Sequence, residues 1–87
     1  MGRKPLTSAQ IRAARALVRW SAEDLARSSM LSVTTIRRAE LTEDETSMTA
    51  ANDVAVRRAL EAAGIEFIDE NGGGPGVRLR KRQQKKG

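Results

Sequence analysis

Two threonines and two arginines share one short segment of this chain, and all four can form directed hydrogen bonds. Arginine carries a planar fork of donors that matches guanine O6 and N7. The threonine hydroxyl can bond to a base or a phosphate, and its methyl group can pack against thymine. A short helix that presents such residues near its start fits the major groove of DNA. The residues are Thr34, Thr35, Arg37 and Arg38.

Two short helices are expected to position these side chains. Ser21 opens the first in an S-x-x-D pattern with Asp24, and Ser32 opens the second, which runs to about Glu40. The turn at residues 28–30 is too short for the two helices to lie antiparallel, and this arrangement is typical of a helix-turn-helix.

The adjacent arginines of the second helix are expected to have different partners. Successive residues of an α-helix point about 100° apart, because one turn takes 3.6 residues. Arg37 and Arg38 therefore cannot both face the floor of the groove. We expect Arg38 to contact base edges and Arg37 to contact the DNA backbone. Val33, or the Thr34 methyl group, is expected to pack against a thymine methyl group.

The rest of the pattern predicts further helices and a C-terminal hairpin. Thr7, in capping-box spacing with Gln10, begins a helix that ends near residue 19 or 20. Another helix starts between positions 49 and 53 and reaches Ala63, and Gly64 caps its end. The segments 65–68 and 77–80 have strand propensity and are joined by a glycine-rich turn. We expect a flexible basic arm at 1–6, a helix-turn-helix domain at 7–64, a β-hairpin at 65–80 and a basic tail at 81–87.

The amino-acid composition limits which functions this chain can have. The chain has 87 residues and contains neither Cys nor His, so thiolate chemistry and the commonest general base are both missing. No Gly-rich phosphate loop or nucleophile elbow is present, so we expect no enzyme, no metal and no cofactor. No apolar run suggests a membrane segment, and we expect a cytoplasmic protein. The basic side chains that give the chain its net charge of +5 lie at the C-terminal end. A basic end of this kind favours contact with polyanions.

The segment also resembles a known family. Leu25-Ala26, Ser32, Ile36 and Arg38-Ala39-Glu40 stand in the pattern of the Cro/CI-type helix-turn-helix regulators of bacteria and phages, also called the XRE family. The resemblance extends over about residues 6–68. It implies a lambda-repressor-like fold of four to five helices, which here would carry a C-terminal β-hairpin or strand.

The resemblance also suggests residue roles. Val33, Thr34 and Arg38 fall where family members contact bases, and Ser21 falls where a phosphate is usually held. Arg15 and Glu40 fall where the family often has a partly buried ion pair. Candidate DNA-binding residues are then Ser21, Ser32, Val33, Thr34, Thr35, Arg37 and Arg38.

Four positions depart from the family pattern, and the first is Ala22, which replaces a Gln that commonly hydrogen-bonds a phosphate. Arg19 and Met30 replace glycines, and a left-handed conformation at Met30 would carry strain of about 1 kcal/mol unless the turn differs. Ala39 is smaller than the usual Ile or Leu. We therefore expect a weakly anchored recognition helix, with the C-terminal hairpin as its brace.

One such domain buries little DNA surface, so a homodimer on a pseudo-palindromic operator is expected. The candidate dimer contacts are Ile65, Phe67, Ile68, Val77 and Leu79. Sequence thus favours a DNA-binding transcription regulator, either a repressor or an autoregulator, with RNA polymerase or a regulatory protein as a further candidate partner. The alternative is an antitoxin or anti-activator whose main role is to bind another protein.

Overall fold

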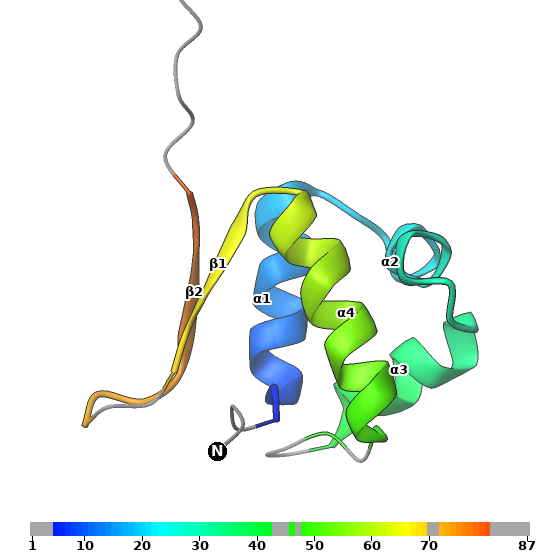
Figure 1. Cartoon of the computed structure of the whole chain (residues 1–87), viewed down its shortest axis with the longest axis horizontal. Coiled ribbons are helices and arrows are strands. Elements are labelled where there is room, and N and C mark those ends of the chain that lie inside the picture. Colours follow the sequence, from blue (N-terminus) through cyan, green and yellow to red (C-terminus); the bar gives the residue numbers. More distant parts are fainter. Residues whose placement is uncertain (1–4, 43–45, 47, 70–71, 81–87) are drawn as a thin grey trace, which may run out of the picture.

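The structure, a computed structural model, describes residues 5–42, 46, 48–69 and 72–80. Within these residues, four helices precede a two-stranded antiparallel sheet, and Figure 1 shows their arrangement. The mainly α architecture with a C-terminal hairpin is therefore confirmed. The elements are α1 (Ser8–Val18), α2 (Ala22–Ser29), α3 (Val33–Leu41), α4 (Ala50–Ala62), β1 (Ile65–Ile68) and β2 (Gly76–Leu79).

Each helix begins at a hydroxyl side chain that accepts a hydrogen bond from the backbone N–H three residues further on. This contact satisfies one of the donors that a helix start leaves without a partner. Two of the four starts are complete capping boxes, in which Gln10 and Asp24 accept in return from the N-cap backbone. The N-cap residues are Thr7, Ser21, Ser32 and Thr49.

Three helix ends depend on a left-handed backbone conformation. Gly64, with φ of 109°, follows α4 and leads into β1, as expected of a glycine cap. Arg19 ends α1 with φ of 59°, and Met30 ends α2 with φ of 62°. The turn between α2 and α3 therefore keeps the conformation that favours glycine, although methionine occupies it.

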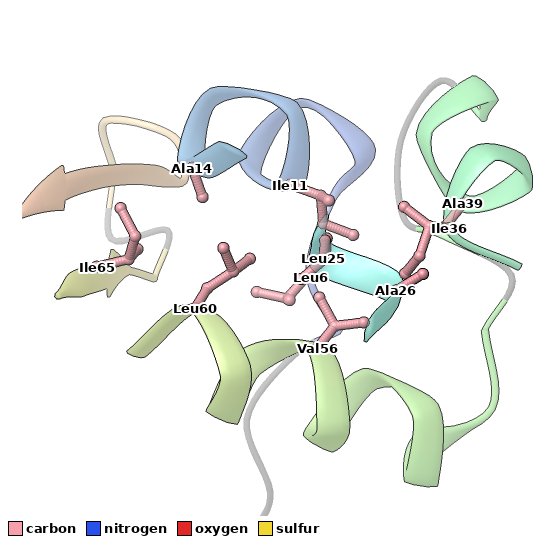
Figure 2. Packing of buried hydrophobic residues seen from close by; sticks show 10 residues of the cluster. All are labelled: Leu6, Ile11, Ala14, Leu25, Ala26, Ile36, Ala39, Val56, Leu60 and Ile65. Atoms are coloured by element: carbon pink, nitrogen blue, oxygen red, sulfur yellow. The ribbon is translucent and has the colours of Figure 1, made fainter. Parts of the chain in front are cut away.

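The core is aliphatic and draws on every helix and on β1, as Figure 2 shows. Leu6 belongs to it with 1% exposure, although the sequence placed this residue in a flexible arm. Its N–H donates to Asp53 Oδ1 at 3.0 Å, and its carbonyl accepts from the N–H of Thr46. The folded domain therefore begins at or before Leu6. The core residues are Leu6, Ile11, Ala14, Leu25, Ala26, Ile36, Ala39, Val56, Leu60 and Ile65.

The hairpin packs against α1 and α4. Gln10 on α1 donates through Nε2 to the carbonyls of Ile68 and Gly76, at 3.4 Å and 3.1 Å, and so ties α1 to both strands. The Arg57 guanidinium of α4 lies 5.3 Å from the centre of the Phe67 ring. In Figure 1 the hairpin and α3 lie on opposite sides of the α1–α4 pair.

Candidate nucleic-acid interface

The turn between α2 and α3 is closed by backbone hydrogen bonds. The N–H of Leu31 donates to the carbonyl of Ala26 at 2.9 Å, and the N–H of Met30 donates to Arg27. Ala26, with 6% exposure, is small where the two helices approach each other, as the sequence suggested. These contacts fix α3 at an angle to α2 and leave one side of α3 uncovered.

Helix α3 has one buried side and one exposed side. Ile36, Ala39 and Glu40 face the domain and are buried, whereas Thr34, Arg37 and Arg38 are exposed. The predicted contact residues thus divide into two groups. Val33 and Thr35 are only half-exposed, and Val33 packs against the core. Part of the Val33 side chain is therefore structural.

Two of the predicted contact residues, Ser32 and Thr35, form hydrogen bonds at the N-cap of α3. The Ser32 hydroxyl accepts from the Thr35 N–H at 3.1 Å and lies 2.9 Å from the Thr35 hydroxyl. Each hydroxyl still has hydrogen-bonding capacity, because a hydroxyl group has one donor and two acceptor sites. Ser32 and Thr35 therefore hold the helix start and can also meet a polar ligand.

Arg38 is an exposed cation whose charge is not matched by a neighbour. Within the described residues its guanidinium has no hydrogen-bond or ion-pair partner. Its side chain lines a hollow of about 190 Å³ between α3 and the start of α4. The other residues of this hollow are Thr35, Ala39, Met48, Thr49 and Asn52.

Arg37 lies towards α2 instead and forms an ion pair there. Its Nη2 is 2.6 Å from Oε2 of Glu23, and both side chains are more than half exposed. The structure thus separates the two arginines, as their helical spacing predicted. The ion pair itself was not predicted, because Glu23 lies 14 residues away on another helix and no local pattern connects the two positions.

Ser21 lies at the start of α2 and is exposed, but its backbone is already engaged. Its N–H donates to Asp24 Oδ2 at 2.9 Å, and its hydroxyl accepts from the Asp24 N–H at 3.0 Å. Hydrogen bonding from Ser21 to its carboxylate, chiefly from the Ser21 backbone N–H and then from its side chain, holds the pKa of Asp24 below its ordinary value. The start of α2 therefore carries its own carboxylate where a phosphate would otherwise meet free amides.

The ion pair expected between Arg15 and Glu40 is present. Arg15 Nε is 2.6 Å from Glu40 Oε2, and Nη2 is 2.8 Å from Oε1, so the contact is bidentate. Its third nitrogen, Nη1, donates to the carbonyl of Trp20 at 2.8 Å. The hydrogen bonds to Glu40 raise the pKa of Arg15 above its ordinary value. Arg15 therefore joins the end of α3 to the segment between α1 and α2.

Two further residues of α1 hold the end of α3, and the sequence did not identify them. Arg12 Nη1 donates to the carbonyl of Glu40 at 2.7 Å, and the Ser8 hydroxyl donates to the carbonyl of Thr42. The only sequence signal is their spacing, since Ser8, Arg12 and Arg15 lie on one face of α1. The expected brace is corrected accordingly: polar contacts from α1 anchor α3, while the hairpin packs on α1 and α4.

The predicted dimer residues do not form one exposed surface. Ile65 is fully buried in the core of its own chain, so its assignment as a dimer contact is corrected to a core residue. Phe67 and Val77 are half-buried and pack against the same core, and Ile68 is half-exposed. Leu79 is 49% exposed, which makes it the most accessible apolar side chain of the hairpin.

Two of the predicted features fall outside the described residues. These two features are the basic tail at 81–87 and most of the basic arm at 1–6. In the part of the chain that is described, no helix is long and apolar enough to cross a membrane. A comparison with protein-family models and with curated protein sequences found no match.

Proposed function

We propose that this chain is a sequence-specific DNA-binding regulator of transcription that acts as a homodimer and lays α3 in the major groove. The observation that carries the proposal is the exposed side of α3. It presents Thr34 and Arg38, a cation with no partner among the described residues, on a helix whose opposite side is buried and whose end is held by α1. A rigid, short, basic helix held at an angle to its neighbour matches the groove in width and charge. The resemblance of this segment to Cro/CI-type regulators supports the same function.

In this proposal each exposed residue has a distinct task. Arg38 donates two hydrogen bonds to guanine O6 and N7, a contact worth about 1–3 kcal/mol of discrimination. Thr34 contacts a neighbouring base, and the exposed part of Val33 packs against a thymine methyl group. Ser21 approaches a phosphate through its hydroxyl, because its backbone N–H is already bonded to Asp24.

The free edge of β2 is the proposed dimer element. The N–H of Arg80 bonds to the carbonyl of Gly64, and the register pairs Glu66 with Arg78. Hydrogen-bonded and non-hydrogen-bonded pairs alternate in an antiparallel ladder, so the peptide groups of Val77 and Leu79 point away from β1. Within the described residues these groups have no backbone partner. A second copy that pairs along β2 would supply one.

Selection of bound sequences from random duplex DNA tests this proposal. The full chain is expected to enrich two half-sites related by twofold symmetry, because a dimer presents two copies of α3. Their centres are expected about one helical turn, 34–36 Å, or a multiple of it, apart. If the protein enriches no sequence although it binds duplex DNA, it is a non-specific binder and the proposal fails.

A further inference from the structure

Glu23 stands out on the face that we propose for DNA, because it is a carboxylate in contact with Arg37 of α3. It lies in the first turn of α2, next to Asp24. Two carboxylates at this helix start already complement the positive end of the helix dipole. A DNA phosphate that approaches α2 on the side of Glu23 would therefore meet negative charge.

The carboxylate of Glu23 forms an ion pair with Arg37 of α3. Arg37 Nη2 lies 2.6 Å from Glu23 Oε2, and the exposed fractions of the two side chains are 59% and 55%. Both remain accessible to DNA, so a phosphate and Glu23 would compete for one guanidinium. Arg38, the neighbouring cation, has no such partner within the described residues. Only one of the two adjacent arginines is thus free to bind DNA.

We propose that Glu23 limits how tightly this face binds nucleic acid, because it holds Arg37 away from the phosphate backbone and so lowers the affinity for all DNA alike. The inference rests on the proposed function and deepens it. Phosphate contacts carry no sequence information, whereas base contacts do. A protein that withholds a phosphate-binding arginine therefore depends more on Arg38 for its affinity.

The salt dependence of DNA binding measures directly whether Arg37 contacts a phosphate. Each phosphate contact releases counterions, so the affinity decreases more steeply with salt. The probe is a random-sequence duplex titrated with the full chain between about 50 and 200 mM salt. Glu23→Gln removes the charge but keeps the shape and the helix propensity. Loss of an exposed ion pair of this kind costs about 0–1 kcal/mol, so this variant is expected to fold.

Glu23→Gln is expected to bind the random duplex more tightly at low salt. It should lose about 3-fold more affinity than the wild type across this range, since one more phosphate contact is formed. Arg37→Gln is expected to leave the wild-type salt dependence unchanged, and in the Glu23→Gln background it should restore the wild-type slope. Glu66→Gln is the matched control, because Glu66 forms a similar exposed pair with Arg78, 3.1 Å apart, on the hairpin.

Two results would overturn the inference while leaving the proposed function intact. In the first, Arg37→Gln flattens the wild-type salt dependence by the full contact, which means that Arg37 already binds phosphate. In the second, Glu23→Gln has no steeper salt dependence than Glu66→Gln. A wild-type chain that binds no duplex at about 50 mM salt would instead overturn the proposed function, and the inference with it.

Discussion

Arg19 and Met30 are the two non-glycine residues with positive φ in the described part of the chain. The left-handed conformation brings Cβ of an L residue close to the following carbonyl oxygen and costs about 1–2 kcal/mol. The sequence left open whether the turn at Met30 is strained or has another geometry. The turn is strained, since Met30 has the left-handed conformation. Met30 is 89% exposed, so its side chain contributes little packing in return.

Met30→Gly is therefore expected to stabilise the domain. The substitution removes the steric cost and loses almost no buried surface, and the larger backbone entropy of glycine in the unfolded chain offsets part of the gain. The expected increase in the free energy of unfolding is about 1 kcal/mol by urea denaturation. Ser28→Gly, at an exposed position within α2, is the control and should destabilise by about 0.5–1 kcal/mol. A decrease for Met30→Gly similar to the control would contradict a strained turn.

At the scale of elements, α3 depends on polar contacts to compensate for its small apolar surface. Ile36 and Ala39 are its fully buried apolar residues. Three hydrogen-bonding side chains of α1 hold the end of α3, and the Arg15–Glu40 contact among them is an ion pair. Glu40 is only 9% exposed, so water cannot readily replace a lost partner. The orientation of α3 therefore depends on this charge pair as well as on its apolar core.

Glu40→Gln tests this anchor. It leaves Arg15 partly buried without its carboxylate, and we expect a loss of about 2–3 kcal/mol in the free energy of unfolding. Amide hydrogen exchange in α3 should accelerate more than exchange in α4. Glu66→Gln breaks an exposed arginine pair and is expected to cost no more than about 1 kcal/mol. Equal losses in the two variants would show that the Arg15–Glu40 pair does not anchor α3.

The sequence predicts those elements that depend on local signals. The helix starts at Thr7, Ser21 and Ser32 are each set by one hydroxyl side chain and the backbone three residues on, and all three occur as expected. The Arg15–Glu40 pair was predicted only through the resemblance, because 25 residues separate its members. The pairing of Glu23 with Arg37 left no signal in the sequence, since the partner of a surface charge depends on how two helices pack.

The burial of hairpin residues was predictable only in part. Strand propensity identified the two strands, and the expected hairpin is present and antiparallel. Which apolar residues meet the domain depends on where the hairpin packs, and that is decided by α1 and α4. Ile65 therefore proved to be a core residue, although Ile68 has the same strand propensity and is only half-buried.

At the scale of the whole molecule, the hairpin and α3 lie on opposite sides of the α1–α4 pair (Figure 1). A dimer formed along β2 would place the two copies of α3 at the outer ends of the assembly. The spacing between half-sites then depends on the width of the domain. In the proposed dimer, dimerisation and DNA contact would use separate surfaces, so each could be removed without the other.

Leu79→Pro tests the dimer element. Proline lacks the N–H that points to the free edge of β2, and edge strands tolerate proline where that N–H faces solvent. We expect a folded monomer by sedimentation, with circular dichroism close to that of the wild type. Leu79→Ala loses the side chain but keeps the N–H, and it should retain more of the dimer. A Leu79→Pro variant that dimerises like the wild type would place the interface elsewhere.

The central claim is that α3 selects DNA sequence through Arg38, and the ratio of affinities for selected and random duplex measures it. Arg38→Ala is expected to weaken binding to the selected duplex by about 1–3 kcal/mol and to reduce that ratio. Preference should relax at one base pair of each half-site. Arg58→Ala, an exposed arginine of α4 outside the hollow beside α3, should leave the ratio unchanged. If Arg38→Ala binds selected and random DNA with the wild-type ratio, Arg38 does not read bases and the account is wrong.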